Sequence, residues 1–228
     1  MISARTASRI SVAGALVVLG LTVFSFAVPP SAACGDLAKG YPPIVAFEMA
    51  RSVSDLQAIF GSAPGECRMA MSANMDSVNT LDCLIYIPAY GAFIAFFLVG
   101  LIGRAPRLAR AGAWIVAVSC LADYVENAGL FNLSAVPDVA SGWLTLMTVA
   151  TEIKWIGLGI AGLIGGLILA RGHGLWWIVL PPCALGLVVA LGTLADAGLA
   201  GPYLSLAFAA GWLVFLVVGV REAVRRTP

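Results

Sequence analysis

Long apolar stretches separated by short polar segments make up most of the chain. A helix needs about 20 consecutive, mostly apolar residues to cross the hydrocarbon core of a membrane. Six stretches approach or exceed that length, at residues 10–28, 81–103, 111–133, 142–170, 175–197 and 203–220. The pattern predicts an all-α fold, a polytopic transmembrane helical bundle of about six spans, which forms a single integral membrane domain over residues 1–228.

The composition supports this class of protein. Of the 228 residues, 61% are hydrophobic and 11% are charged, whereas soluble domains have about 45–50% apolar and about 25% charged residues. The lipid bilayer is therefore the expected partner of most of the surface. The formal net charge of +1 gives no basis for nucleic-acid binding, and nothing in the sequence identifies a protein partner.

The arginines indicate the orientation of the chain, because Lys and Arg are enriched in cytoplasmic loops. With six alternating crossings, nine arginines fall on one side of the membrane: Arg5, Arg9, Arg104, Arg107, Arg110, Arg171, Arg221, Arg225 and Arg226. Most acidic loop residues fall on the other side. We therefore expect a multi-pass protein of a bacterial-type inner (plasma) membrane, with cytoplasmic N- and C-termini and an extracytoplasmic loop at residues 29–80.

The first apolar stretch has two interpretations. Arg5 and Arg9 precede it, and Ser31-Ala32-Ala33 before Cys34 resembles a signal-peptidase site. However, residues 10–28 are long for the apolar region of a signal peptide, which has about 7–15 residues. We favour a retained transmembrane helix, and cleavage before Cys34 would leave five spans.

The extracytoplasmic loop contains one segment with helical periodicity. Pro42 and Pro43 suit the first turn of a helix, and Gly61 suits its end. Between them, apolar residues recur at spacings of three and four: Val45, Met49, Val53, Leu56 and Phe60. This pattern predicts one amphipathic helix over residues 43–60. Such a helix can lie on the membrane surface, cap the bundle or dock a partner.

Cysteine and histidine usage limits the chemistry to be expected. Cys34 and Cys67 both fall in the outer loop, where disulfides persist, so they form a candidate disulfide. The chain has no Cys-x-x-Cys pair, which argues against a thiol oxidoreductase. His173 is the single histidine and is expected in a solvated cytoplasmic loop. Without a cluster of His and Cys, we expect no zinc or haem site and no cofactor.

Ionisable residues inside the predicted spans are the strongest functional signal. A central Asp or Lys costs about 2.5–3.5 kcal/mol on the scale of translocon-mediated insertion. Four such residues are expected deep in the membrane: Asp123, Glu126, Glu152 and Lys154. Because this cost is high, we expect these side chains to face the interior of the bundle and not lipid.

Helical spacing shows which of the polar residues share a face. In the third span, five residues form one stripe: Ser119, Cys120, Asp123, Glu126 and Asn127. In the second span, Asp82, Tyr86 and Tyr90 are spaced by four and form another stripe. In the fourth span, Glu152 and Lys154 point about 160° apart, at roughly 100° per residue.

Depth and charge suggest how these stripes combine. Asp82 lies near the outer boundary and Lys154 near the middle of the membrane, so the polar residues predict a funnel that opens outward and is lined by Tyr86 and Tyr90. Asp123, Glu126 and Glu152 against Lys154 leave two excess negative charges if all are ionised. At least one carboxyl is therefore expected to hold a proton, or the site to bind a cation.

The sequence leaves three functions open, and a fourth explanation in which buried ion pairs only join helices. The site can bind or transport a small cation or a proton-linked solute. Alternatively, the chain can be an intramembrane enzyme acting on a lipid or prenyl chain, with Asp123 or Glu126 as general acid or base and Lys154 stabilising negative charge. It can also be a non-catalytic assembly or sensor subunit. The sequence contains no nucleophile with a paired base, which counts against the enzyme. Binding or transport is therefore our first hypothesis.

Overall fold

The computed structural model describes residues 2–27, 32–38, 41–138, 142–171 and 176–224. These residues form helices and connecting turns: α1 (Ala4–Ala27), α2 (Pro43–Glu48), α3 (Val53–Phe60), α4 (Glu66–Leu81), η1 (Asp82–Tyr86), α5 (Ile87–Gly100), α6 (Pro106–Ala135), α7 (Gly142–Ala170), α8 (Trp176–Ala195), α9 (Ala197–Ala200), η2 (Gly201–Tyr203) and α10 (Leu204–Val224). None of the described residues lies in a β-strand. The predicted all-α class is confirmed.

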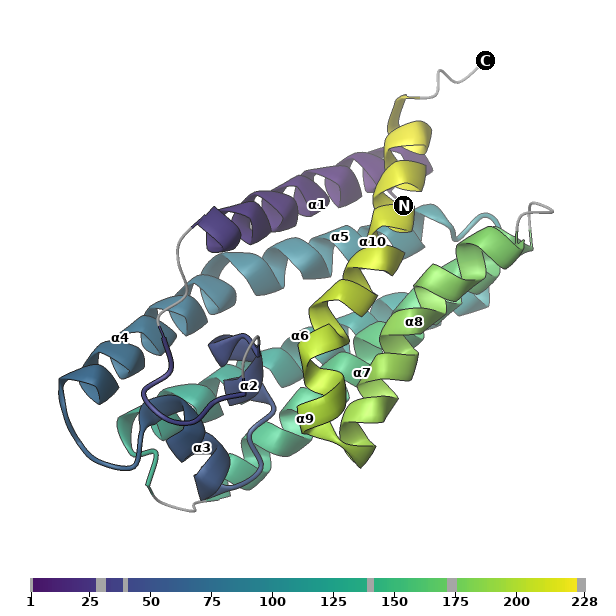
Figure 1. Ribbon diagram of the computed structural model, residues 1–228. Coiled ribbons are helices and arrows are strands. Elements are labelled where there is room, and N and C mark those ends of the chain that lie inside the picture. Colours follow the sequence, from purple (N-terminus) through teal and green to yellow (C-terminus); the bar gives the residue numbers. More distant parts are fainter. Residues whose placement is uncertain (1, 28–31, 39–40, 139–141, 172–175, 225–228) are drawn as a thin grey trace.

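Six helical stretches within the described residues are long and apolar enough to cross a membrane, as predicted. The fourth of them, α7, has the bounds expected from hydropathy alone. The first residues of α1 and the last of α10 lie at one end of the bundle (Figure 1), where the Arg5 side chain donates a hydrogen bond to the Ala223 carbonyl at 3.4 Å. An even number of crossings requires this arrangement.

The six spans form a closed ring. Each spanning stretch packs on two neighbours, in the order α1, α5, α6, α7, α8, α10 and back to α1. Glycines permit the closest approaches, because a Cβ at Gly159 of α7 would lie 2.6 Å from the Leu187 Cα of α8, and one at Gly14 of α1 would lie 2.6 Å from the Ala89 carbonyl oxygen. Such contacts draw the backbones together, as is usual for helices packed in lipid.

The second span is longer than hydropathy predicts. We expected it to begin near residue 81, whereas a helix already begins at Glu66 and continues through α4, η1 and α5. Met71, Met75 and Asn79 lie one turn apart and are buried, and this face holds the polar α4 segment in place. The π-helical turn η1 precedes Pro88, which has no N–H for the regular bond to the carbonyl four residues earlier.

The single helix expected over residues 43–60 is wrong, because two short helices, α2 and α3, occupy this segment. The break has a local cause. Ser52 caps α3 by accepting a hydrogen bond from the Asp55 N–H, while the Asp55 carboxylate accepts one from the Ser52 N–H, which is a capping box. Ser52 itself is extended, and the short connection between the two helices carries Arg51.

Helices α2 and α3 cap the bundle at the end opposite the termini (Figure 1). Buried side chains of α2 and α3, such as Phe47 and Phe60, join a core that includes Met75 of α4, Leu133 of α6 and Met147 of α7. This chain itself therefore covers the apolar faces of both helices. Of the alternatives for this segment, the described contacts match the one in which it caps the bundle.

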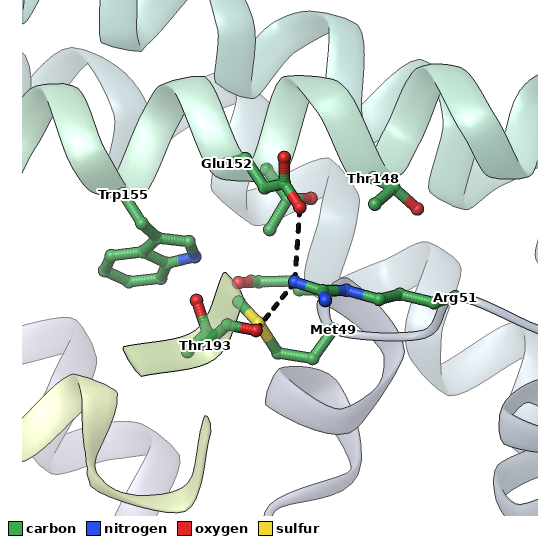
Figure 2. A pocket seen from close by; sticks show the side chains of 8 residues that line it. Met49, Arg51, Thr148, Glu152, Trp155 and Thr193 are labelled. Carbon is green, nitrogen blue, oxygen red and sulfur yellow. Dashed lines mark hydrogen bonds and ion pairs between the residues drawn. The ribbon is translucent and has the colours of Figure 1, made fainter. Parts of the chain in front are cut away.

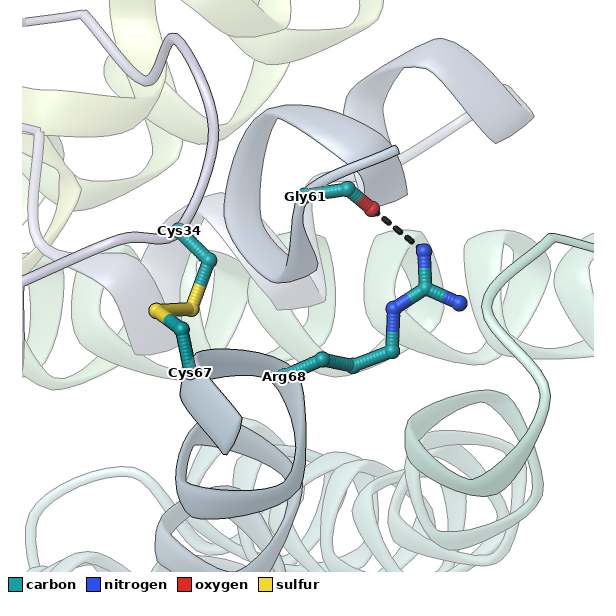
Figure 3. Close-up of a disulfide and its surroundings, with 4 residues drawn as sticks. All are labelled: Cys34, Gly61, Cys67 and Arg68. Carbon is teal, nitrogen blue, oxygen red and sulfur yellow. Dashed lines mark hydrogen bonds between the residues drawn. A yellow bond between two sulfur atoms is a disulfide. The ribbon is translucent and has the colours of Figure 1, made fainter. Parts of the chain in front are cut away.

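A disulfide and a hydrogen bond hold the segment that precedes α4 to that helix (Figure 3). Cys34 and Cys67 form a disulfide with a Cα–Cα distance of 5.9 Å, which confirms the predicted bridge. Arg68 donates to the Gly61 carbonyl at 2.6 Å and forms an ion pair with Asp138. Hydrogen bonding to Arg68 lowers the pKa of Asp138 below its ordinary value.

Some sequence-based expectations lie outside the described residues. They concern the solvated position of His173, the signal-peptidase resemblance at Ser31, and two of the nine arginines, Arg225 and Arg226.

Candidate functional site

Lys154 of α7 lies at the centre of the polar residues and is 3% exposed. Its Nζ lies 2.8 Å from the Glu126 carboxylate, 3.2 Å from Glu48 Oε2 and 3.4 Å from Asp123 Oδ1. Asp123 and Glu126 come from α6 and Glu48 from α2, so three elements meet here. Asp123 and Glu126 are both buried and face the bundle interior, as expected from the cost of exposing a charge to lipid, and both contact Lys154.

Two glycine contacts bring α6 and α7 close on either side of Lys154. A Cβ at Gly157 of α7 would lie 2.2 Å from Ser119 Oγ of α6, and one at Gly129 of α6 would lie 2.8 Å from the Met147 Cβ of α7. Lys154 and its α6 partners lie between these contacts along both helices. The short side chains hold the two backbones close enough for the ammonium and carboxylate groups to meet directly.

Asp123 has the largest number of hydrogen-bond donors in the site. Tyr90 Oη of α5 donates to Asp123 Oδ2 at 2.6 Å, and Asn127 Nδ2 donates to Asp123 Oδ1 at 3.2 Å. Lys154 is the third donor. Asn127 Nδ2 also donates to Asp82 Oδ2 at 2.7 Å, which links the site to η1. We call Glu48, Asp82, Asp123 and Glu126 around Lys154 the acidic cluster.

The two tyrosines expected to line the path have different environments. Tyr90 is 2% exposed and contacts the acidic cluster through its hydroxyl group. Tyr86 is half-buried, and its ring packs edge-on against that of Tyr90 with centroids 5.8 Å apart. The stripe predicted in the second span therefore does face α6 at Asp82 and Tyr90.

Glu152 does not join the acidic cluster. Its side chain is 32% exposed and forms an ion pair with Arg51 at 3.2 Å. The expectation that it is one of three buried carboxylates around Lys154 is corrected by this position. The 160° angle between Glu152 and Lys154, at about 100° per residue along the helix, is the physical reason.

Glu48 occupies the place expected for Glu152, and the sequence analysis did not identify it. It follows the apolar face of α2 and contacts a lysine 106 residues away, which no local pattern indicates. Burial raises the pKa of Glu48 above its ordinary value, and the negative charge of Asp123 raises it further, although the Lys154 ammonium opposes both effects. This carboxyl group therefore holds a proton more tightly than a free glutamate does.

With Glu48 in place of Glu152, the site still has an excess of negative charge. The acidic cluster contains four carboxyl groups and one ammonium group. Full ionisation would leave three negative charges without compensation inside the bundle, which is costly. The cluster must therefore hold protons or bind cations.

On the side of α2 and α3, a recess adjoins the acidic cluster (Figure 2). Its lining comes from three elements and from the α2–α3 connection: Glu48, Met49, Arg51, Thr148, Thr151, Glu152, Trp155 and Thr193. The Arg51 guanidinium crosses the recess, donating from Nη2 to Glu152 Oε1 at 3.2 Å and to the Thr193 carbonyl at 2.8 Å. Glu48 lines this recess and also contacts Lys154.

On the other side of the acidic cluster, aromatic rings fill the bundle. Tyr90 stacks on Trp212 with centroids 6.2 Å apart, and Phe97 stacks on Phe215 at 4.1 Å. We call the following group of rings the aromatic plug: Phe93, Phe97, Phe208, Trp212 and Phe215. Trp155, beside Lys154, packs on Phe208 at 5.0 Å and so joins the cluster to the plug.

This geometry supports proton exchange and cation binding. Neighbouring carboxyl groups can share protons, the ammonium group can stabilise whichever carboxylate is ionised, and Glu48 offers a connection to the recess. The chain was also compared with known proteins. No protein-family model, no curated protein and no solved structure matches it.

Proposed function

We propose that this chain binds a proton, or a small solute whose binding is linked to a proton, at the acidic cluster, with access from the outer side of the membrane. The orientation of the arginines supports a bacterial-type inner membrane and cytoplasmic termini. One observation carries the proposal. The Lys154 ammonium contacts three carboxylates, and one of them, Glu48, also lines the recess.

A proton suits the acidic cluster better than a metal cation. The Lys154 ammonium stands between the carboxylates, in the position that a bound cation would occupy. A metal ion would have to displace this group or share the site with its positive charge. Protons need no such space, because they bind to the carboxyl groups themselves. Protonation removes the excess negative charge without moving Lys154.

The hydrogen bonds suggest how protons are distributed. Asp123 already accepts hydrogen bonds from three donors, on Tyr90, Asn127 and Lys154. Glu126 is fully buried and has Lys154 as its hydrogen-bond partner, as has Glu48. We therefore assign the exchangeable protons to Glu48 and Glu126. Glu48 would exchange first with the outer solution through the recess.

Movement of a solute across the whole membrane would require a second conformation. From Tyr90, the aromatic plug continues along α5 through Phe93 and Phe97 toward Gly100, which lies near Ala4 at the start of α1. Its rings are in contact, and Phe93 and Phe215 are buried. Binding from the outer side is thus the first step of the proposed function, and transport would follow when the plug opens.

Infrared difference spectroscopy of the protein in liposomes tests the proposal. A protonated carboxylic acid absorbs separately from a carboxylate, so a pH titration reports the exchangeable protons directly. We expect a carboxylic-acid band in the wild-type protein that shrinks in Glu48→Gln and in Glu126→Gln. The matched control is Glu66→Gln, which removes an exposed acid from the start of α4 and should leave the band unchanged.

The opposite result is equally clear. If Glu48→Gln and Glu126→Gln both leave the carboxylic-acid band at its wild-type size, then neither residue holds a proton, and the proposed function is wrong. If the band does shrink, proton movement into reconstituted vesicles, followed with a trapped pH-sensitive dye, separates binding from transport for the wild-type chain.

A further inference from the structure

The recess beside the acidic cluster is lined by groups of both charge signs. Glu48 and Glu152 can accept hydrogen bonds, whereas Arg51, Thr151 and Trp155 can donate them. A site for a simple anion or cation would need mainly one kind. The mixture therefore points to a ligand that itself carries both a donor and an acceptor.

One buried donor in the recess lacks a partner among the described residues. Thr151 is 2% exposed, and its hydroxyl has no hydrogen bond. The Trp155 indole nitrogen is turned toward the recess in Figure 2, where it faces the Glu48 carboxyl group. By contrast, the hydroxyl groups of Thr148 and Thr193 donate to backbone carbonyls of their own helices. A buried unpaired donor is costly, so an acceptor on a ligand is expected beside Thr151.

The contact of Arg51 with Glu152 uses fewer donors than a guanidinium group can offer to a carboxylate. A guanidinium group has five N–H donors arranged to hold a carboxylate at two oxygens. Arg51 contacts Glu152 through Nη2 alone, at 3.2 Å, and its side chain is 34% exposed. While Arg51 holds Glu152, the recess has free space for about one water molecule. A small carboxylate can therefore enter only by taking the place of Glu152, with a two-oxygen contact to Arg51, while Arg51 keeps its bonds to the Thr193 and Leu194 carbonyls.

The contacts of Lys154 show how Glu48 and Trp155 can bind an ammonium group. Its Nζ lies 3.2 Å from Glu48 Oε2 and 4.7 Å from the centre of the Trp155 ring. A carboxylate and an aromatic ring are the usual partners of alkylammonium ligands. Glu48 and Trp155 also line the recess, so they can receive a second ammonium group from the outer side.

The recess and the acidic cluster together disfavour a ligand with net charge. An anion would approach the excess carboxyl groups of the cluster, and a simple cation would approach Arg51. We propose that the recess binds a small zwitterion, an amino acid with little or no side chain, with its carboxylate on Arg51 and its ammonium on Glu48. This proposal rests on the proposed function, because Glu48 must release its proton to the outer solution when the ammonium binds.

The proton balance follows from the groups around Glu48. The neutral Glu48 carboxyl group loses one proton and becomes the carboxylate that pairs with the incoming ammonium, while the zwitterion keeps all its own protons. Eight charged or titratable groups face or adjoin Glu48: Lys154, Asp123, Glu126, Asp82, Tyr41, Tyr86, Arg51 and Glu152. None of the others needs to change its charge in this step.

Calorimetric titration of the purified full-length protein in lipid nanodiscs tests the proposal. The probes are glycine, β-alanine and γ-aminobutyrate, with methylamine and acetate as the separate halves of a zwitterion. We expect at least one zwitterion to bind and neither half to bind alone. Arg51→Gln should weaken binding about tenfold or more, since hydrogen bonds to a charged group are strong. Thr151→Val should also weaken it.

Three further variants make the test specific. Arg51→Lys keeps the positive charge and should bind more tightly than Arg51→Gln, which separates recognition from folding. Glu152→Gln removes the competitor for Arg51, so binding should strengthen or stay unchanged, and a loss of binding would contradict the assigned roles. Glu66→Gln removes an exposed acid that does not line the recess, and its zwitterion affinity should equal that of the wild-type protein.

Two outcomes overturn the zwitterion site. One is that no zwitterion binds. The other is that methylamine binds as well as the zwitterions and Arg51→Gln leaves that binding unchanged. A pH indicator in weak buffer separates this result from the proposed function. Binding should release a proton from the wild-type protein and none from Glu48→Gln. Zwitterion binding that releases no proton, with no infrared band from Glu48, would keep the recess as a site but contradict the proposed function.

Discussion

Different forces hold together the two halves of the bundle, although the same helices build both. We call the half on the side of α2 and α3 the outer half, and the half that carries the termini the inner half. In the outer half, α7 presents Lys154 to carboxylates on α6 and α2. One to three turns further along α7, the chain presents small residues to neighbouring helices, and Gly165 lies against the Phe215 ring, where a Cβ would be 2.4 Å from a ring carbon. Polar contacts specify partners in the first case, and shape does so in the second.

This difference indicates where function resides. An apolar side chain inside the bundle needs no partner to offset its desolvation, whereas each buried charge must be compensated by a partner or a proton. A chain that needed only stability would fill both halves with apolar side chains, as it does around Phe93 and Phe215. The acidic cluster keeps more carboxyl groups than Lys154 can neutralise, which is a poor way to join helices and a good way to bind protons.

The largest expected effect comes from removing the ammonium group of the outer half. Lys154→Met leaves buried carboxylates without their counter-ion and should destabilise the protein by about 3–5 kcal/mol. Adding Glu126→Gln removes the nearest of these carboxylates, at 2.8 Å, and should restore part of the loss. Thermal unfolding in detergent compares the two. A double variant no more stable than Lys154→Met would show that Lys154 and Glu126 are not coupled.

A smaller effect is expected from the link that holds the outer cap. Cys34→Ser with Cys67→Ser opens a bridge between residues 33 positions apart, and such losses cost about 2–4 kcal/mol. Because the bridge anchors the segment that carries Glu48, the infrared band of Glu48 should also weaken. Cys83→Ser is the control, since Cys83 is a free cysteine. An unchanged band would mean that the cap keeps Glu48 in place without the disulfide.

The smallest effect is expected in the inner half. Leu98→Met exchanges one fully buried apolar side chain for another of similar volume, so it should cost less than about 1.5 kcal/mol. The carboxylic-acid band of the acidic cluster should not change at all. A shift of that band in this variant, measured beside the wild-type protein, would show that packing in the inner half affects the acidic cluster. It would contradict the separation of the two halves.

The features that local sequence patterns predicted are those set by helical periodicity. The length of each apolar stretch identified the spans, and the bounds of α7 agree with hydropathy. The stripe on α6 predicted that Asp123, Glu126 and Asn127 would face inward, because residues three and four apart share a side of any helix. Neither result required knowledge of which helices are neighbours.

Other features depend on contacts between distant residues or on weak signals. Glu48 meets Lys154 across 106 positions, and no periodicity reports such a contact. The helix α4 was missed because its exposed faces are polar and it lies beyond the apolar stretch. One error was avoidable in principle. Ser52 and Asp55 have the spacing of a capping box, which is a local signal that a new helix starts after Ser52.

The protonation of Glu48 is the central claim, and the pH dependence of stability tests it most directly. Burial raises the pKa of Glu48 in the folded protein, so its stabilising contribution is present below the pKa of the unfolded chain and is lost as pH rises through the higher folded value. Asp138 has the opposite sign. Its pKa is lowered, so its contribution is present at higher pH and is lost as pH falls.

Thermal unfolding of the wild-type protein, Glu48→Gln and Asp138→Asn should be measured across the acidic to neutral range. Glu48→Gln should lose less stability than the wild-type protein as pH rises, because glutamine imitates the protonated acid at every pH. Asp138→Asn should lose less stability than the wild-type protein as pH falls. If Glu48→Gln follows the wild-type curve at every pH, Glu48 holds no proton in the folded protein, and the acidic cluster does not exchange protons with the recess through this residue.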